Sequence, residues 1–176
     1  PVLFRMTTRI CHSKSLVELG ERVEPADRPY ERSLKYVTTP ALAYKNHAKV
    51  EKNLELLESY SNVCPLNRME MKGSKIGVIS ASIAYQYAKE AFPEDTSFLK
   101  LGLTNPLPMD LIKEFASQVE KLYVIEELEP FMEEQIRAHG IECEGKKYTG
   151  NLYELNPELV RTRVFGGEPE FKTIQL

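Results

Sequence analysis

The stretch from Lys75 to Gly145 decides the fold, because short apolar runs alternate there with segments of helical periodicity. The runs predicted as strands are KIGVIS (75–80), SFLKLGL (97–103), KLYVIEE (121–127) and IECEG (141–145). The segments predicted as helices are SIAYQYAKEAF (82–92), MDLIKEFASQV (109–119) and PFMEEQIRAHG (130–140). Apolar strands separated by helices favour a parallel sheet with right-handed crossovers. The sequence therefore predicts an α/β fold with a mainly parallel sheet and helices on both faces.

Proline content and charge divide the chain around this stretch. The predicted segments are a remnant of a preceding domain at 1–20, a linker at 21–73, the α/β domain at 74–165, and a tail at 166–176 leading to a missing domain. We expect a strand at Val2–Met6 and a helical turn at 15–20, with residues 1–45 poorly packed because that strand has no neighbour. Apolar spacing predicts an amphipathic helix at 46–60 in the linker and a last helix within 151–165.

Composition excludes several classes of function. The chain has 176 residues, a net charge of −3 and a pI near 5.8, which argue against binding to nucleic acid or to an anionic membrane. Its sequence contains no apolar run long enough to span a bilayer. The three cysteines, Cys11, Cys64 and Cys143, are widely spaced, so we expect free thiols in a reducing cytoplasm and no disulfide, zinc or iron–sulfur framework.

The turn after the first predicted strand of the α/β domain offers a candidate anion site. Ser80 and Ser82 lie where the strand opens onto a helix N-terminus, whose backbone N–H groups favour negative charge. The segment GVISASI has one glycine, so it meets neither the dinucleotide fingerprint nor the P-loop pattern. The structural alternative is a tight turn in which Ser82 caps the helix.

Polar residues also follow the next two predicted strands, at the edge where α/β folds bind ligands. Thr104 and Asn105 follow one strand, and Glu126 and Glu127 end the next. Because neighbours in a strand point to opposite faces, the two glutamates do not form a paired acid–base site. We expect one of them to cap or pair with the start of the following helix.

A second polar group, Arg9, His12 and Ser13, could bind a carboxylate or phosphate. No carboxylate or nucleophile nearby in the sequence completes a catalytic triad, and the alternative is a polar domain boundary. His47 and His139 lie at predicted helix ends and share no ligand spacing with the cysteines. The sequence therefore predicts no metal site.

Beyond these local features, the chain resembles the alpha subunit of indolepyruvate ferredoxin oxidoreductase over about 165 residues in unbroken order. The matching segments are PVLFRMTTRICHSKSLVELGER (1–22), SNVCPLNRMEMKGSKIGVISASIAYQYAKEAF (61–92), LKLGLTNPLPMDLIKEFA (99–116), LYVIEELEPFMEEQIRAHGI (122–141) and NLYELNPELV (151–160). The patterns GVIxxxxAYQY and VIEELEPFxEEQI are the specific ones. The general strand–helix order is shared with the C-terminal-like domains of transketolases. The sequence departs from the family at Ser80–Ser82, where a threonine, a serine and a glycine are expected.

The resemblance implies an enzyme that decarboxylates aryl pyruvates, makes aryl-acetyl-CoA and passes electrons to ferredoxin. It implies thiamine diphosphate, Mg²⁺ and 4Fe-4S clusters as cofactors of the full enzyme, and a beta subunit as partner. This chain contains neither the metal–diphosphate motif nor clustered cysteines. We therefore expect an internal part of an alpha subunit that binds none of these cofactors, is inactive alone and serves in assembly.

Two other readings stay open from the sequence. One is a 2-oxoacid:ferredoxin oxidoreductase acting on pyruvate or a branched-chain oxoacid. The other is a stand-alone, non-catalytic α/β module that binds an anion or a protein partner.

Overall fold

The computed structural model describes residues 3–6, 8–27, 29–34 and 37–167, and leaves the side chains of Arg9 and Ile10 undescribed. The chain forms two units, Pro1–Val37 and Thr38–Leu176. In the first unit the described side chains are exposed, and α1 (Thr8–His12) is its α-helix among the described residues. The helical turn expected at 15–20 does not form. Of the strand expected at Val2–Met6, Val2 lies outside the described residues and 3–6 pair with no strand.

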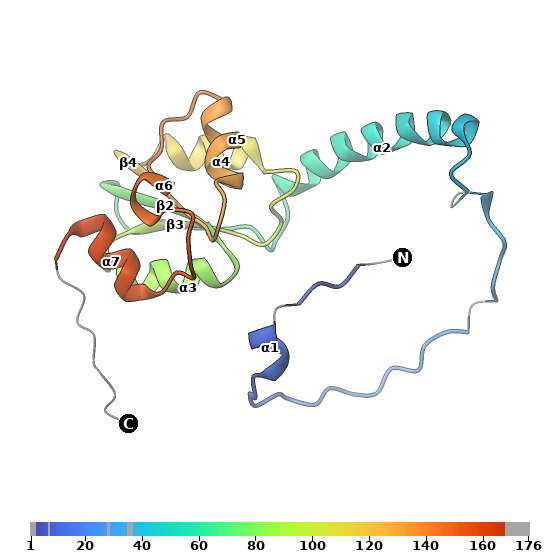
Figure 1. Ribbon diagram of the computed structural model, residues 1–176, viewed down its shortest axis with the longest axis horizontal. Coiled ribbons are helices and arrows are strands. Elements are labelled where there is room, and N and C mark those ends of the chain that lie inside the picture. The colour runs from blue at the N-terminus through green and yellow to red at the C-terminus, as the bar shows by residue number, and fades with distance from the viewer. Residues whose placement is uncertain (1–2, 7, 28, 35–36, 168–176) are drawn as a thin grey trace. The chain divides into compact units, whose positions relative to one another are not determined.

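The second unit is built around a four-stranded sheet. Its elements are α2 (Pro40–Ser61), β1 (Arg68–Glu70), β2 (Ile76–Ala81), α3 (Ser82–Ala91), β3 (Ser97–Leu101), α4 (Met109–Ala116), β4 (Lys121–Ile125), α5 (Phe131–Ala138), α6 (Lys146–Thr149) and α7 (Pro157–Phe165). The strand order is β1-β3-β2-β4, with β2 parallel to both neighbours and β1 antiparallel to β3. Helices α4 and α5 lie on one side of the sheet and α3 and α7 on the other (Figure 1). The α/β class with a mainly parallel sheet is confirmed.

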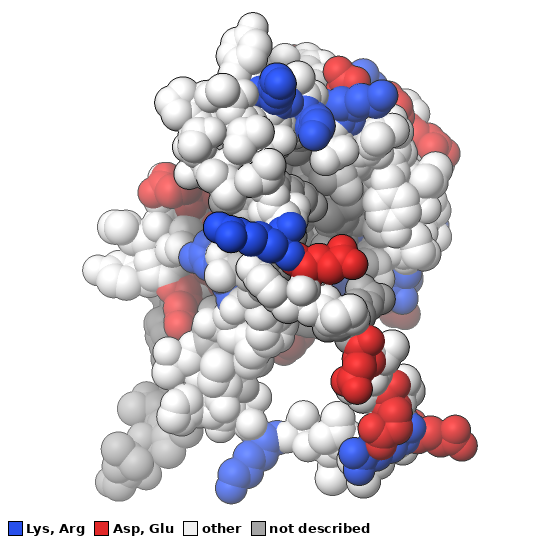
Figure 2. All heavy atoms as spheres, turned by 90° about the vertical axis from the view of Figure 1, so that its right-hand side faces the viewer, with Lys and Arg blue, Asp and Glu red and all other residues white. Residues whose placement is uncertain are grey.

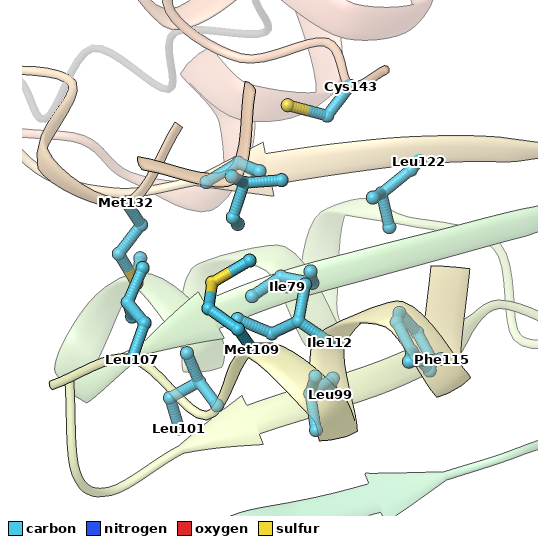
Figure 3. Close-up of a cluster of buried hydrophobic side chains, with 12 residues drawn as sticks. Ile79, Leu99, Leu101, Leu107, Met109, Ile112, Phe115, Leu122, Met132 and Cys143 are labelled. Atoms are coloured by element: carbon cyan, nitrogen blue, oxygen red, sulfur yellow. The ribbon is translucent and has the colours of Figure 1, made fainter. Parts of the chain in front are cut away.

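The pleat of the strands divides the apolar side chains into two cores. On one face Ile79 and its neighbours on β3 and β4 pack against Met109, Ile112 and Phe115 of α4, which point towards the sheet (Figure 3). Ile112 and Phe115 are fully buried, because α4 places apolar residues three apart on one face. Met132 and Ile136 bring α5 into the same core.

The opposite face of the sheet is covered by α3 and α7. Val78, adjacent to Ile79 on β2, faces this second core together with Phe98 and Tyr123. The ring of Phe92 makes edge contacts with both Phe98 and Tyr123, at centroid distances of 6.5 and 5.3 Å. Alternating residues of each strand therefore serve opposite cores, as the two-residue period of a strand requires.

Two asparagines join the end of α2 to the sheet. Oδ1 of Asn62 accepts hydrogen bonds from the N–H groups of Asp110 and Leu111, and so caps the first turn of α4. Oδ1 of Asn67 accepts from the N–H groups of Gly102 and Leu103, just after β3. The remaining length of α2 is largely exposed. On the face drawn in Figure 2, positive and negative side chains are interspersed with uncharged areas.

The element boundaries differ from the sequence expectations in three places. Helix α2 begins at Pro40, six residues before the expected start, because proline is well suited to the first turn of a helix. The segment predicted as a strand at 141–145 makes one bridge, between Glu144 and Tyr123. The linker expected to hold a single helix also contributes β1 to the sheet.

Strand β1 is fixed to α3 by a side-chain cluster. The carboxylate of Glu70 accepts a hydrogen bond from the Tyr85 hydroxyl at 2.7 Å and forms an ion pair with the ammonium of Lys89, also at 2.7 Å. Burial would raise the pKa of Glu70, but the hydrogen bonds from Lys89 and Tyr85 outweigh it and hold that pKa below its ordinary value. The cluster's stabilisation is therefore present above the ordinary carboxyl pKa and is lost as the pH falls through the lowered value.

Replacing Tyr85 with Phe should lower the free energy of unfolding by roughly 1–2 kcal/mol near pH 7, because a partly buried hydrogen bond to a carboxylate is lost. The deficit should shrink in acid, where Glu70 is protonated in both proteins. Chemical denaturation of the wild type, Tyr85→Phe and Tyr87→Phe at several pH values measures this. A deficit that is independent of pH, or equal in the two variants, would contradict the assignment.

Candidate functional site

The carboxyl ends of the parallel strands bring the candidate polar residues to one edge of the sheet. Because β3, β2 and β4 are neighbours and parallel, the segments that follow them share that edge. Ser80 and Ser82 come from β2 and α3, and Thr104 and Asn105 from the loop after β3. Glu127, with Glu126, comes directly after β4. The strand order therefore brings these residues to one edge, and a ligand-binding role for any of them stays a prediction.

The two serines of the predicted anion site have different environments. Ser80 is fully buried, and its hydroxyl donates to the carbonyl oxygen of Ile125 at 2.6 Å. That bond links β2 to β4 and engages the proton of Ser80. Ser82 is exposed and adopts φ 53°, in the left-handed region that favours glycine. Helix α3 begins at Ser82 itself, with Ala81 at the cap position and no capping side chain, so the predicted capping role of Ser82 is wrong.

Glu126 caps the next helix, as expected for one of the two glutamates. Its carboxylate is buried and accepts the N–H groups of Met132 and Glu133 at 2.8 and 2.9 Å. Pro130 precedes α5 and has no side-chain acceptor, so the carboxylate reaches in from the strand end. Burial raises the pKa of Glu126 above its ordinary value of 4.5, although these two N–H groups oppose the shift.

Glu127 and Glu129 tie the loop after β4 to the loop before α7. Both carboxylate oxygens of Glu127 lie 3.2 Å from the N–H of Leu155. One oxygen of Glu129 accepts from the side-chain amide of Asn151 at 2.9 Å. Together these bonds hold residues 151–155 against the carboxyl end of β4.

Lys146 and Glu133 also belong to this edge, and sequence reasoning missed both. The ammonium of Lys146 donates to the carbonyl oxygen of Glu126 at 2.5 Å. Buried Glu133 accepts the N–H of Lys146 at 2.7 Å and pairs with Arg137 at 2.8 Å. Burial lowers the pKa of Lys146, although the surrounding carboxylates, Glu126 first, oppose that shift. The sequence feature that could have indicated Lys146 is the short segment 141–144 between Gly140 and Gly145. This segment brings the chain back to β4, where Glu144 forms a bridge with Tyr123.

A close backbone approach makes this return possible. A Cβ atom at Gly145 would fall against the carboxylate of Glu133 and lie 3.1 Å from the carbonyl oxygen of Val124. Glycine therefore lets the chain pass beside β4 where Glu133 binds the following N–H. The chemical consequence is that both carboxylate oxygens of Glu126, Glu127 and Glu133 are engaged by groups of the chain itself.

The other predicted group, Arg9, His12 and Ser13, lies in a different unit of the chain. His12 ends α1 and Ser13 follows it, both exposed, and the side chain of Arg9 lies outside the described residues. These three residues belong to the first unit, whereas the residues of the sheet edge belong to the second.

A hollow of about 720 Å³ lies at the opposite end of β4, near Lys121. It is bounded by Arg137 and by residues 140–144, and carries charges of both signs. Arg137 is paired with Glu133, and Lys147 lies 3.6 Å from Glu144. The ammonium of Lys121 lies 4.8 Å from the ring centroid of Tyr123. Because each lining cation already contacts a carboxylate or an aromatic ring, the hollow does not indicate a ligand class.

No protein-family model matches the chain. Curated relatives do match along most of its length. Indolepyruvate oxidoreductase subunit IorA of Thermococcus kodakarensis is 34% identical over 172 residues, which cover 88% of this chain and 27% of that protein. The subunits of the same name from Methanothermobacter thermautotrophicus and Archaeoglobus fulgidus are 32% and 34% identical and cover 94% and 93% of this chain. The chain is homologous to a part of subunit IorA. It spans between a quarter and three tenths of the length of these relatives.

A solved structure supports the fold. It is a 2-oxoglutarate:ferredoxin oxidoreductase from Magnetococcus marinus with 2-oxoglutarate, coenzyme A and succinyl-CoA bound. It aligns with a TM-score of 0.52 and 21% identity, over 72% of this chain and 23% of that one. At this identity the likeness establishes a shared α/β architecture.

No group of three or more His, Cys, Asp or Glu is placed to hold a metal among the residues that the structure describes. Cys64 and Cys143 are buried in different parts of the second unit, and the carboxylates of Glu126 and Glu133 are engaged by N–H groups. These donor sets therefore do not fit an iron–sulfur cluster or a diphosphate-bound Mg²⁺.

None of the described helices is long and apolar enough to cross a membrane.

The raised pKa of Glu126 predicts a pH dependence. The folded protein binds this proton more tightly than the unfolded chain, so the contribution of Glu126 to stability falls as the pH rises from about 4.5 through the raised value. Unfolding free energies measured from pH 4 to 8 should show this decline in the wild type and lose it in Glu126→Gln. Glu129→Gln, an exposed change in the same loop, is the control. A wild-type protein whose stability relative to Glu126→Gln rises over that range would contradict the assignment.

The left-handed backbone at Ser82 predicts a stabilising substitution. Ser82→Gly should raise the free energy of unfolding by about 0.5–1 kcal/mol, because glycine adopts this φ without a Cβ clash. Gln86→Gly, at an exposed site within α3, should instead lower it by about 1 kcal/mol. Thermal or chemical unfolding distinguishes the two signs. Equal destabilisation by both glycines would show that Ser82 is not strained.

Proposed function

We propose that this chain is part of the alpha subunit of a thiamine-diphosphate-dependent 2-oxoacid:ferredoxin oxidoreductase that acts on indolepyruvate or another aryl pyruvate. The reaction is oxidative decarboxylation to the aryl-acetyl-CoA, with electrons passed to ferredoxin. The observation that carries the proposal is the match to subunit IorA along 88–94% of the chain. The beta subunit is the proposed partner, and Mg²⁺ and 4Fe-4S clusters are proposed cofactors held elsewhere in the enzyme.

Within that enzyme, we assign residues 74–165 a role in assembly. The polar edge of the sheet supports this assignment, because its carboxylates accept hydrogen bonds from backbone N–H groups of neighbouring segments. Lys146, the basic side chain at this edge, donates to a carbonyl oxygen of the chain. A general base or nucleophile must point towards a substrate, whereas these groups are turned towards N–H and carbonyl groups of the chain itself.

The complete subunit, produced with its beta partner, tests the proposal. Ferredoxin reduction should depend on coenzyme A and thiamine diphosphate, and kcat/KM should be higher for indolepyruvate and phenylpyruvate than for pyruvate or 2-oxoglutarate. A preference for pyruvate or a branched-chain oxoacid would assign the protein to another branch of these enzymes. An assembled, cofactor-loaded complex with no oxoacid activity would reject the proposed reaction.

The assembly role predicts a mild effect at Glu127. Glu127→Gln keeps an oxygen that can accept the N–H of Leu155, so turnover of the complete enzyme should stay within about tenfold of wild type, or roughly 1.4 kcal/mol of barrier. Glu129→Gln, in the same loop, is the matched control. Turnover reduced several hundred-fold in Glu127→Gln alone, with assembly and cofactor content intact, would place this carboxylate in the reaction.

A further inference from the structure

Exposed apolar side chains gather on the two loops joined by Glu127 and Glu129. Leu128 is 63% exposed and Phe131 is 50% exposed, at the start of α5. On the facing loop, Leu152 is 69% and Tyr153 84% exposed. Large apolar residues in this number, on loops held side by side, are typical of a protein contact surface.

Two of these residues have unfavourable backbone conformations. Leu128 has φ 54° and Tyr153 has φ 67°, where bulky L-residues are rarely found. Each such residue costs on the order of 1–3 kcal/mol and persists only when its surroundings impose it. Burial in the core of this unit does not offset that cost, because both side chains are mostly exposed. The strain therefore holds apolar side chains at the surface.

Hydrogen bonds on either side of the strained residues impose this conformation. Leu128 lies between Glu127 and Glu129, which bind the N–H of Leu155 and the side chain of Asn151. The same two bonds bracket Tyr153 on the facing loop. The surface is therefore fixed before any partner binds, which lowers the entropy cost of binding.

Most of the charge around these side chains is negative. Segments 126–134 and 150–156 contain six glutamates and neither lysine nor arginine. The glutamates that reach the surface are Glu127, Glu129, Glu134 and Glu154. The neighbouring cations of Lys146 and Arg163 donate to the carbonyl oxygens of Glu126 and Thr149. An acidic, apolar surface repels nucleic acid and anionic lipid and is complementary to lysine or arginine beside apolar groups.

We propose that segments 126–134 and 150–156 form a docking surface for the companion subunit of the oxidoreductase, which presents lysine or arginine beside apolar side chains there. This inference rests on the proposed function for the identity of the partner. The acidic rim and the exposed apolar side chains define the chemistry of the partner surface. The loops contribute contact area and charge and take no part in the reaction.

Substitutions of opposite charge at Tyr153 test whether the partner surface is positively charged. Tyr153→Lys and Tyr153→Glu both remove the aromatic ring, but only the lysine is repelled by lysine or arginine side chains of the partner. In the complete subunit, the Kd for the isolated beta subunit, measured by calorimetry at low salt, should rise at least about tenfold more for Lys than for Glu. The difference should shrink at high salt. Tyr44→Lys and Tyr44→Glu are the matched controls, since Tyr44 on α2 is 86% exposed and should show no such asymmetry.

Several results would overturn the inference. Equal weakening by both Tyr153 substitutions would show that the partner is not basic, and unchanged affinity would show that it does not bind there. Altered self-association of the complete subunit alone, measured by sedimentation in the Tyr153 variants, would assign the surface to a second copy. A wild-type enzyme that assembles and reduces ferredoxin while the variants bind normally would reject the docking surface and leave the proposed function standing. Wild-type subunits that neither associate nor react would reject both.

Discussion

The burial of β2 on both faces is the constraint on which the second unit depends. Val78 and Ile79 are both fully buried although they point to opposite sides of the sheet. Each side therefore needs its own covering layer, and the helical connections between parallel strands supply both layers. A Cβ at Gly77 would lie within 2.9 Å of Val119 and 3.1 Å of Phe115, so the segment that follows α4 packs directly onto the strand.

The same arrangement explains why the carboxyl edge is rich in glutamate. The strands end there in helix N-termini and tight loops whose N–H groups have no backbone acceptor. Glu126 supplies an acceptor for α5, Glu133 for the start of α6 and Glu127 for the loop before α7. Loop closure thus gives Glu126, Glu127 and Glu133 of the pattern VIEELEPFxEEQI a structural role.

The sequence predicted correctly those helices and strands that carry a local signal of their own. It did not predict the elements whose position depends on residues distant in the sequence. Strand β2 and helix α7 were predicted because apolar runs and a proline after an Asn cap are local signals. Strand β1 was missed because its three residues have no such signal, and Tyr85 and Lys89 hold it from α3. The position of the polar edge was predicted in the same way. The edge follows from strand order, whereas the place of Lys146 depends on a later return of the chain to β4.

Local rules of backbone conformation are broken at the same edge. Ser82, Leu128 and Tyr153, the described non-glycine residues with positive φ, lie in the segments that follow β2 and β4 and in the loop bound to them. Strain in a natural protein is retained where it serves function, and it can serve either reacting groups or contact groups. Here the polar groups are engaged internally and the exposed strained side chains are leucine and tyrosine. The strain at Leu128 and Tyr153 therefore supports the docking surface proposed above.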